Sequence, residues 1–369
     1  MLQIFYKILR PLGTQNDGNI MRKNRFSIWA LVFVFGLSLS VAQAKDKAKP
    51  AVKHVILISV DGLRPDAISV LGPKEAPAFY EIINNGATTL NARTDYDYTV
   101  TLPDHWCMLT SLRVVGEKGH HYAINSYKGQ TIHQVKGKYV PGIFDVTHEH
   151  GLRSAFFSAK SKFMLYIKSY GAKGMDRQPN VDYEGKYLID AYRLIDSNDD
   201  AVVGSFLKKL SAAQTAFLFL HVVGVDKAGH AYTWNLIPGS EYMNAVKKVD
   251  GLLGKILQAI RSNKKLADST AIIITADHGG IGNAHRDSKD KRNYTIPFLV
   301  WGKAVAQGAD LYRLNPKTRK DPGKVAVPYD VPGQPIRNGD AANLALSLLG
   351  LPAIPGSTIN SHQDLNVFP

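Results

Sequence analysis

Three aspartates of the sequence share one placement, because each comes just after a short apolar run. They are Asp61, Asp226 and Asp277, and the runs before them are His54–Val60, Ala216–Val225 and Ala271–Ile274. Apolar runs without polar alternation are typical of strands that are buried on both faces, as in parallel sheets. Since open parallel sheets bind ligands at the carboxyl ends of their strands, we expect the three carboxylates to converge there.

Three histidines accompany these carboxylates. His230 lies four residues after Asp226, His278 adjoins Asp277, and His285 follows seven residues later. One Asp-His pair is weak evidence, because turns are rich in Asp and most single histidines lie on the surface. Together, three carboxylates and three imidazoles are enough to hold two divalent ions. Nitrogen and oxygen ligands without sulfur suit Zn²⁺ best and also accept Mn²⁺ or Fe²⁺. Two ions about 4 Å apart stabilise the attacking and leaving oxygens in displacement at phosphorus.

A hydroxyl that could act as the nucleophile comes from the segment Thr99–Trp106. Pro103 is placed to start a helix, so Thr101 would stand just before the first turn, where backbone N–H groups and the helix dipole favour an anion. A threonine hydroxyl is a weak nucleophile unless a metal ion activates it. The alternative is that Thr101 or Asp104 only caps the helix, and this segment alone does not decide between the two.

The elements that must position these residues alternate between strand and helix, which predicts an α/β fold with a mostly parallel sheet. Gly239–Ile260 has apolar residues along one face and is predicted to be the helix of a right-handed crossover between the Asp226 and Thr270 strands. Residues 166–200 are rich in Tyr, Asp, Lys and Gly and are predicted to form a cap over the site. Further strands are expected at Gly86–Arg93, Arg153–Ala159 and Ile296–Trp301, and helices at Ala76–Asn84 and Ala341–Leu351.

The N-terminus has the features of a secretory signal peptide. A basic cluster after Met21 is followed by the apolar run Phe26–Val41 and by small residues up to Ala44, after which we expect cleavage. The alternative is a membrane anchor, but the apolar run is only as long as the shortest spans. Residues 1–44 would then be leader and signal peptide, with Met21 as a candidate true start. The prediction is a secreted or periplasmic protein whose residues 45–369 form a single catalytic domain.

Composition sets further limits. Residues 1–44 hold five basic residues and one acidic residue, so without them the net charge falls from +14 to +10. A modestly basic surface suits anionic substrates or lipid headgroups, and no basic run alternates with aromatics as in nucleic-acid-binding modules. Cys107 is the one cysteine, so the chain can form no internal disulfide. Its apolar surroundings indicate a buried core residue rather than a nucleophile.

Four motifs in this order resemble those of the alkaline phosphatase superfamily, and most closely its nucleotide pyrophosphatase/phosphodiesterase branch. They are Asp61-Gly-Leu-Arg, Thr101-Leu-Pro-Asp-His, Asp226-Lys-Ala-Gly-His230 and Ala276-Asp-His-Gly-Gly. The resemblance covers about residues 54–355. It implies a three-layer sandwich with helices on both faces of the sheet and a small cap. The position after the motif proline, usually Asn in that branch, is Asp104 here.

The resemblance also implies roles for individual residues. One metal would be held by Asp61, Thr101, Asp277 and His278, and the other by Asp226, His230 and His285. His362 is the competitor of His285 for the third imidazole of the second metal. Asn125 matches an Asn that contacts a non-bridging phosphoryl oxygen in that branch. Thr101 would attack phosphorus to form a covalent phosphothreonine, and water would then release the product.

The substrate class depends on whether a cation meets the second charge of a terminal phosphate. Monoesterases of this superfamily place an Arg near the nucleophile, whereas here the next arginine is Arg113, twelve residues after Thr101. An uncharged Asn125 therefore favours a phosphodiester or pyrophosphate bond in a nucleotide-type substrate. Trp106 and Tyr166 could stack on a nucleobase or leaving group, and so could Tyr170 and Trp234, although aromatic residues more often pack in the core.

Other functions remain open at this point. A phosphomonoesterase or phosphonate hydrolase of the same superfamily is the main alternative enzyme. A sulfatase would need a Cys or Ser in a Cys/Ser-x-Pro-x-Arg setting, which neither Thr101 nor Cys107 provides. An inactive scaffold that binds metal or phosphate is the alternative without catalysis. No specific nucleic acid partner and no membrane span after signal cleavage are expected.

Overall fold

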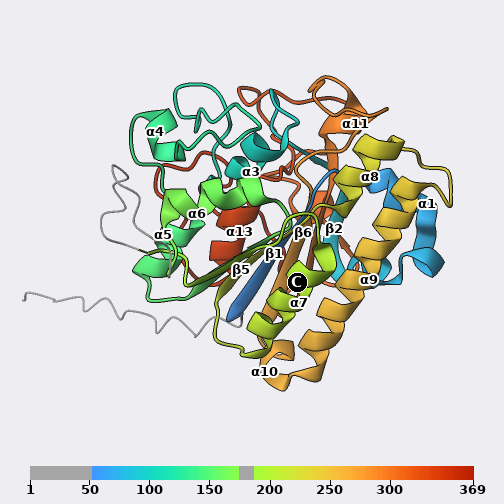
Figure 1. The fold of residues 1–369 in the computed structure, drawn as a ribbon, viewed down its shortest axis with the longest axis horizontal. Coiled ribbons are helices and arrows are strands. Elements are labelled where there is room, and N and C mark those ends of the chain that lie inside the picture. Colours follow the sequence, from blue (N-terminus) through green and yellow to red (C-terminus); the bar gives the residue numbers. More distant parts are fainter. Residues whose placement is uncertain (1–51, 174–186) are drawn as a thin grey trace, which may run out of the picture. The chain divides into compact units, whose positions relative to one another are not determined.

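The computed structural model describes residues 52–173 and 187–369, and an eight-stranded sheet runs through this part (Figure 1). The strand order is β4-β3-β5-β1-β6-β7-β2-β8. The strands are β1 (His54–Val60), β2 (Gly86–Arg93), β3 (Ser154–Ser158), β4 (Ala191–Leu194), β5 (Phe217–Val222), β6 (Thr270–Thr275), β7 (Thr295–Gly302) and β8 (Ala309–Asp310). The mostly parallel sheet that the sequence predicts is therefore confirmed.

Strand direction brings the ends of three central strands together. Strands β3, β4, β5, β1 and β6 pair in parallel, whereas β7 runs antiparallel to both β6 and β2. Ile58 of β1 lies opposite Leu220 of β5 and Ile274 of β6. Since neighbouring parallel strands end at the same edge, the residues that follow β1, β5 and β6 meet at one edge of the sheet.

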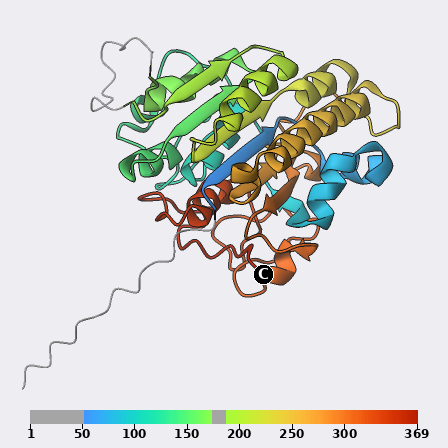
Figure 2. The ribbon, with the colours of Figure 1, turned by 90° about the horizontal axis from the view of Figure 1, so that it is seen from below.

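Helices cover both faces of the sheet (Figures 1 and 2). On one face α9 packs against α1, α2, α7, α8 and α10. On the other face α13 packs against β1, β6, α3 and α5, and the Tyr170 ring of α6 contacts the Phe144 ring of α5. The first layer comprises α1 (Pro65–Glu75), α2 (Pro77–Asn84), α7 (Asp199–Ser211), α8 (Gly224–Tyr232), α9 (Glu241–Ser262) and α10 (Lys264–Ala267). The second comprises α3 (Thr101–Thr110), α4 (Ile132–Lys136), α5 (Ile143–Glu149), α6 (Met164–Tyr170) and α13 (Asp340–Leu348).

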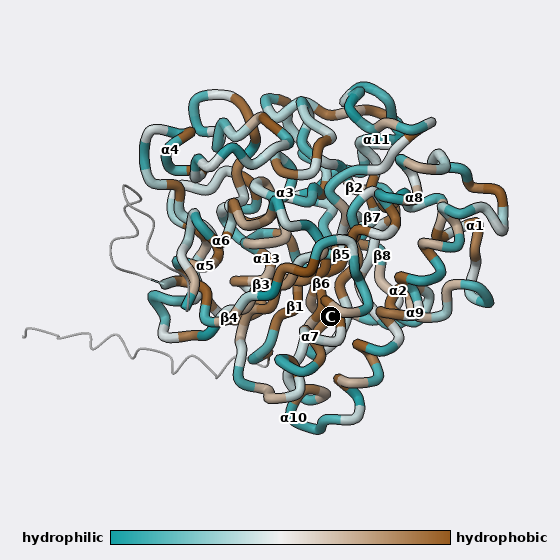
Figure 3. The backbone as a smooth tube through the Cα atoms, viewed as in Figure 1, coloured by the Kyte–Doolittle hydropathy of each residue, from teal (hydrophilic) through white to brown (hydrophobic). Residues whose placement is uncertain are grey.

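The core lies where the two helix layers meet the central strands. Every residue of β1, β5 and β6 is buried, and these strands form the most hydrophobic part of the tube in Figure 3. Helix α9 contributes one apolar face to this core and leaves its other face exposed. Coverage of both sheet faces explains why the strands read as unbroken apolar runs instead of alternating patterns.

Two of the element boundaries that differ from the sequence prediction lie next to predicted site residues. Strand β5 ends at Val222 and α8 begins at Gly224, so Asp226 lies in the first turn of a helix instead of at a strand end. The buried carboxylate of Asp199 stops the strand, because it accepts hydrogen bonds from the N–H groups of Val223 and Gly224 at 2.8 Å each. Helix α3 begins at Thr101, two residues before the proline that was expected to start it.

Parts of the sequence prediction fall outside the described residues. The leader and signal peptide lie within residues 1–51, and residues 174–186 belong to the segment expected to form the cap. Of the rest of that segment, Tyr166–Tyr170 is the end of helix α6 and Ala191–Leu194 is edge strand β4. Among the residues that the structure describes, none of the helices combines the length and apolar character needed to cross a bilayer.

Asp250 of α9 provides a test of how the first helix layer is held together. Its carboxylate accepts hydrogen bonds from the N–H groups of Ala78 and Phe79, in the first turn of α2. Asp250→Ala would leave two buried donors unpaired, so we expect a loss of about 1–3 kcal/mol in the free energy of unfolding. Urea denaturation followed by circular dichroism measures this loss. Asp268→Ala, which removes an exposed carboxylate, is the control, and equal effects of the two variants would contradict the prediction.

Candidate metal centre

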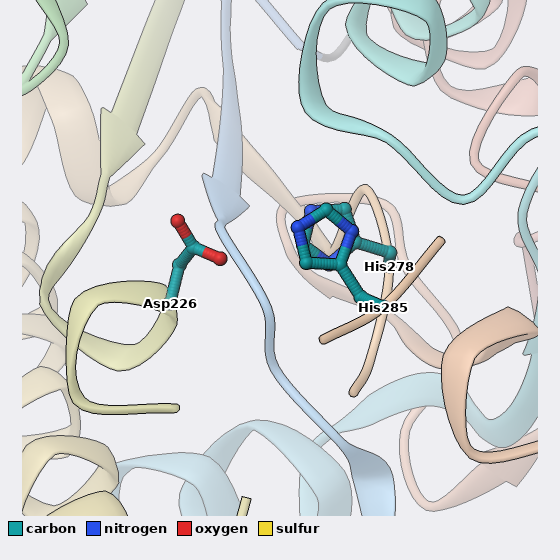
Figure 4. A group of neighbouring side chains, drawn as sticks. All are labelled: Asp226, His278 and His285. Atoms are coloured by element: carbon teal, nitrogen blue, oxygen red, sulfur yellow. The ribbon is translucent and has the colours of Figure 1, made fainter. Parts of the chain in front are cut away.

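Six of the seven predicted metal ligands form a cluster at the carboxyl edge of the central strands. Asp61 follows β1, Asp226 lies in the first turn of α8, and Asp277 and His278 follow β6. The remaining two are His230 of α8 and His285 of the loop after β6. Asp61, Asp277 and His278 form one group and Asp226, His278 and His285 another, each with ligand atoms within 4.8 Å of one another. Figure 4 shows Asp226 across from the overlapping rings of His278 and His285, whose centroids lie 3.6 Å apart.

The ligand atoms of this cluster have the bonding state that a divalent ion requires. Asp61 Oδ1, Asp226 Oδ1, Asp277 Oδ2 and His278 Nε2 are buried and have no hydrogen-bond partner among the described residues. Unpaired buried polar atoms are costly and rare in folded proteins. Four of them in one cluster, with oxygen and nitrogen as the donor atoms, fit two sites for divalent ions. The residues present therefore suit the metals that the sequence predicts.

Backbone carbonyl groups fix the three imidazoles for coordination. The Nδ1 atoms of His230, His278 and His285 lie 2.8, 2.8 and 2.6 Å from the carbonyl oxygens of Asn283, Gly279 and Thr99. A carbonyl oxygen only accepts hydrogen bonds, so in each ring Nδ1 carries the proton and Nε2 keeps its lone pair. His230 Nε2 lies 3.4 Å from Asp226 Oδ1. This arrangement is the one that metal-ligating histidines adopt in proteins.

Burial keeps the imidazoles of His278 and His285 neutral, and it shifts the pKa values of Asp61 and Asp277 in opposite directions when combined with their neighbours. It lowers the pKa of His278 to about 4 and, together with the neighbouring His278, that of His285 to about 3. Burial also acts to raise the pKa of Asp61, but the Lys160 ammonium and His221 hold it well below its ordinary value. For Asp277, burial and the Asp61 charge raise the pKa well above the ordinary value. Bound cations would favour the ionised form of both.

Two buried histidines beneath the cluster were missed by the sequence reasoning. His221 of β5 donates its Nε2–H to Asp61 Oδ2 at 2.9 Å, and its Nδ1 accepts from the hydroxyl of Ser158 at 3.0 Å. His105 of α3 bonds to the backbone carbonyl of Thr101 at 2.7 Å and to Ser59 at 2.8 Å. These contacts orient the carboxylate of Asp61 and the first turn of α3, which begins at Thr101. A histidine inside the apolar run of β5 was a usable signal, because a buried polar side chain needs a partner.

Close backbone packing supports the ligand loops. Gly62 has φ +71°, its N–H donates to Asp277 Oδ1 at 3.1 Å, and a Cβ there would lie 3.0 Å from Cα of Asp226. Trp234 is 3% exposed and donates its indole N–H to the Gly62 carbonyl at 2.9 Å. Its ring centroid lies 5.1 Å from that of His230. Trp234 therefore packs behind the ligands and does not stack on a substrate.

The predicted nucleophile and its neighbour Asn125 lie beside this cluster. Thr101 is the first residue of α3 and is 1% exposed. Asn125 Oδ1 accepts from the N–H of Leu102 at 3.1 Å and from Lys162 Nζ at 2.8 Å. Both partners are donors, so the oxygen of the amide must face them. The Nδ2 group is left without a partner in the described residues and is available to a substrate oxygen.

Two lysines that the sequence reasoning missed, Lys160 and Lys162, extend to Thr101 and Asn125. Lys160 Nζ lies 2.6 Å from Asp61 Oδ2, 2.9 Å from Asp226 Oδ2 and 3.3 Å from Thr101 Oγ1. Burial acts to lower the pKa of Lys160, but Asp61 and Asp226 raise it above its ordinary value. Burial and Lys160 lower the pKa of Lys162 to about 8. Both lysines follow β3 at the carboxyl edge of the sheet. This position was a signal in the sequence that they could reach the site, but a weak one, because lysines after strands are common on surfaces.

Several other predicted residues lie away from the site. Trp106 and Tyr166 are fully buried, with ring centroids 4.4 Å apart, so the prediction that they stack on a substrate is wrong for this structure. Tyr170 is 1% exposed and packs in the same aromatic group. His362 lines a separate cavity of about 590 Å³ and belongs to neither ligand group.

Asp104 and Cys107 are buried side chains of α3 and belong to neither ligand group. Asp104 is buried and accepts from the N–H groups of Asp95 and Val100 at 3.0 and 2.9 Å, and so fixes the approach to α3. Burial and Asp95 raise the pKa of Asp104 well above its ordinary value. Cys107 is a buried free cysteine, as the composition predicts.

A cavity of about 530 Å³ adjoins Asn125. Tyr98, Val100 and Ile124 contribute its apolar wall, and the exposed Asp97 and Arg286 contribute one charge of each sign. Its volume lies within the range of small-molecule sites. The cavity therefore leaves room for the organic part of a substrate whose reacting group is held near Asn125.

Comparison with known proteins gives a family and a set of relatives. The family model of type I phosphodiesterase / nucleotide pyrophosphatase matches residues 55–336. GPI ethanolamine phosphate transferase 1 of Yarrowia lipolytica is 26% identical over 348 residues, which is 88% of this chain and 35% of the relative. The Mus musculus protein of that name is 24% identical over 360 residues, 88% of this chain and 34% of the relative. The chain thus spans about a third of the length of these relatives.

Solved structures share the fold. Murine ectonucleotide pyrophosphatase / phosphodiesterase 5 superposes with a TM-score of 0.57 at 15% identity, over 85% of this chain and 100% of that chain. The lipoteichoic acid synthase LtaP from Listeria monocytogenes gives a TM-score of 0.56 at 13% identity, over 84% of this chain and 75% of that chain. The alkaline-phosphatase-like fold expected from the sequence is therefore confirmed.

The contact between His221 and Asp61 leads to a prediction about metal binding. His221→Leu removes the N–H that orients the Asp61 carboxylate, so we expect the affinity for Zn²⁺ to fall by about 10–100-fold. Competition with a chromophoric chelator measures this affinity. His148→Leu, on α5 and outside both ligand groups, should bind Zn²⁺ like the unmodified protein. Unchanged affinity in His221→Leu would show that this hydrogen bond does not support the site.

Proposed function

The chain belongs to the type I phosphodiesterase / nucleotide pyrophosphatase family of the alkaline phosphatase superfamily, and we propose that it is an exported hydrolase of phosphate esters. At the level of the family, it is a metal-dependent phosphoryl-transfer enzyme. The observation that carries the proposal is the position of the Thr101 hydroxyl. It contacts Lys160, whose ammonium group also bonds Asp61 and Asp226 of the two ligand groups. Export is supported by the signal-peptide pattern of residues 1–44.

We assign the ligands to two ions in the way that the resemblance implies. Asp61, Thr101, Asp277 and His278 would hold one, and Asp226, His230 and His285 the other. We propose zinc for both, because the donor atoms are nitrogen and oxygen without sulfur. When bound, such ions supply positive charge that lowers the pKa of a coordinated hydroxyl and stabilises a departing oxygen.

The residues of the chain then account for two displacements at phosphorus. The Thr101 hydroxyl gives its proton to solvent and its oxygen attacks phosphorus. The bond from phosphorus to the leaving oxygen breaks, and the leaving group departs with the electron pair and takes a proton from solvent. Asn125 Nδ2 donates to a non-bridging oxygen and holds the phosphoryl group in line. Water next attacks the phosphothreonine, the bond from phosphorus to the threonine oxygen breaks, and Thr101 regains its proton. For a monoester the net change is ester plus water to inorganic phosphate plus alcohol, and for a diester it is diester plus water to monoester plus alcohol.

Two substrate classes are candidates for this chemistry. The resemblance and the uncharged Asn125 support a phosphodiester or pyrophosphate bond in a nucleotide-type substrate, for which the 530 Å³ cavity offers room. The argument from sequence against a monoester was that the nearest cation is Arg113. Lys160 lies 3.3 Å from the Thr101 hydroxyl, which favours the second candidate, a phosphomonoester or phosphonate.

Transfer to an acceptor other than water is the activity that the names of the sequence relatives suggest. Those relatives are GPI ethanolamine phosphate transferases, and the group bonded to the Thr101 oxygen can pass to an alcohol as it can to water. Ethanolamine phosphate carries an ammonium group, however, and like charges repel. Lys160 beside Thr101 and Lys162 beside Asn125 therefore disfavour that group as the one transferred, and we propose water as the acceptor.

The nucleophile can be tested by removing its hydroxyl. Thr101→Ala is expected to keep its bound zinc by elemental analysis and to lose turnover of p-nitrophenyl esters by about three orders of magnitude or more. Thr101→Ser keeps a hydroxyl and should retain measurable turnover. In acid-quenched samples of the unmodified enzyme, mass spectrometry should find one phosphoryl group on the Thr101 peptide. Bound zinc with no turnover in the unmodified protein would support the inactive scaffold instead.

The acceptor can be tested by product analysis. With p-nitrophenyl phosphate as substrate, hydrolysis predicts equal amounts of p-nitrophenol and inorganic phosphate, also when excess ethanolamine is present. ³¹P NMR of the products distinguishes inorganic phosphate from phosphoethanolamine. Phosphoethanolamine as the main product would contradict hydrolysis and show transfer of the phosphoryl group to an alcohol.

A further inference from the structure

We infer that Lys160 and Lys162 bind the oxygens of the transferred group and make the enzyme select substrates in which this group is a terminal, doubly charged phosphoryl group. The inference rests on the proposed function and names its substrate class. It follows from where the two lysines are held, which atoms they contact and how charge is distributed in the site.

The segment Ser158–Lys162 is held firmly in place. The N–H of Lys160 donates to Ser158 Oγ at 3.1 Å, and the N–H of Ser161 donates to Asp196 Oδ1 at 2.9 Å. Phe163, at the end of the short 3₁₀ turn Ser161–Phe163, is fully buried. With the backbone fixed in this way, the two side chains extend from the carboxyl end of β3 toward Thr101 and Asn125.

Lys160 and the two ions do not need the same atoms. The ammonium group of Lys160 contacts the Oδ2 atoms of Asp61 and Asp226. The Oδ1 atoms of both carboxylates are buried and have no hydrogen-bond partner among the described residues. Each carboxylate therefore has one oxygen for the lysine and one for an ion. The lysine can stay beside the Thr101 hydroxyl while the ligand groups are filled.

Lys162 lacks a carboxylate partner in the described part of the chain. Its Nζ contacts the side-chain oxygen of Asn125 at 2.8 Å and the backbone oxygen of the same residue at 3.5 Å. A half-buried cation that is bonded only to neutral oxygens is incompletely compensated. A phosphoryl oxygen near Asn125 Nδ2 would give Lys162 an anionic partner. Lys160 and Lys162 would then contact oxygens on the same phosphorus.

The charge of the site favours a dianion. With two divalent ions held by three carboxylates the excess is one positive charge, and the two lysines raise it to three. A monoester or phosphonate brings two negative charges on its reacting group, whereas a diester brings one. In a diester, one of the oxygens that an ammonium group contacts would be an ester oxygen, which carries no negative charge. In a partly buried site such charge differences act strongly.

Two p-nitrophenyl esters with the same leaving group separate these possibilities on zinc-loaded enzyme. p-Nitrophenyl phosphate offers a dianionic group and bis-p-nitrophenyl phosphate a monoanionic one. We expect the unmodified enzyme to prefer the first in kcat/KM. In Lys162→Met this preference should fall by about tenfold or more, because a charge-assisted hydrogen bond to the dianion is lost. Lys162→Arg keeps the charge and should restore part of it.

Controls separate binding from folding and from the proposed function itself. Lys168→Met removes another half-buried lysine from the neighbouring helix and should leave the preference unchanged. Lys160→Met should lower the same preference at unchanged zinc content. Inorganic phosphate should inhibit Lys162→Met more weakly than the unmodified enzyme. The inhibition constant should rise by about the factor by which kcat/KM for p-nitrophenyl phosphate falls.

The outcomes are distinguishable. A preference of the unmodified enzyme for the diester, or an equal loss on both esters in Lys162→Met with phosphate inhibition unchanged, would overturn the inference and leave the hydrolase intact. No turnover of either ester by the zinc-loaded unmodified enzyme would overturn the proposed function. Circular dichroism recognises a variant that unfolds. If Lys162→Met unfolds, Lys162→Arg is used instead, and a ratio of kcat/KM for the monoester to that for the diester that equals the ratio of the unmodified enzyme or is lower by less than tenfold supports the inference, whereas a complete loss of the preference overturns it.

Discussion

Repulsion among three carboxylates is the constraint to which the rest of this site responds. Asp61 and Asp277 are fully buried, and Asp226 is 4% exposed. Carboxylates so close together in a region of low dielectric are tolerated only with compensating positive charge. The protein provides part of it through Lys160 and part through N–H groups such as that of His221. The buried oxygens that remain without a partner show where further positive charge belongs.

The apolar helix layers strengthen the repulsion among the carboxylates, because they exclude water from the site. They also determine the geometry of the site. Because helices cover both faces of the sheet, polar groups are concentrated where the parallel strands end. Backbone carbonyls accept the Nδ1–H groups of the imidazoles and turn each Nε2 atom toward the carboxylates. Trp234 and Gly62 fill the space behind these loops, so the ligands are backed by rigid backbone. A preorganised set of donor atoms is what metal catalysis requires of a protein.

Much of this arrangement follows from local patterns in the sequence. Unbroken apolar runs marked β1 and β6 well, and the parallel-sheet rule then placed Asp61 and Asp277 at one edge. The boundary of β5 was wrong because a tertiary contact from Asp199 ends the strand, and no local pattern contains that information. The burial of Trp106 was equally hidden, since its aromatic neighbours lie far along the chain. The two lysines beside Thr101 and Asn125 were missed for a related reason. Distance along the chain pointed to Arg113, whereas strand order brings Lys160 to Thr101.

The chain of contacts from the lysine segment to the metal ligands has a consequence for how this enzyme can evolve. Ser158 bonds the backbone N–H of Lys160 and also the ring of His221, and that ring bonds Asp61. A substitution that moves the segment Ser158–Lys162 will therefore also move the carboxylate of Asp61 through Ser158 and His221. Anion recognition and cation retention are mechanically joined, so descendants with a new substrate range will tend to acquire an altered metal requirement at the same time.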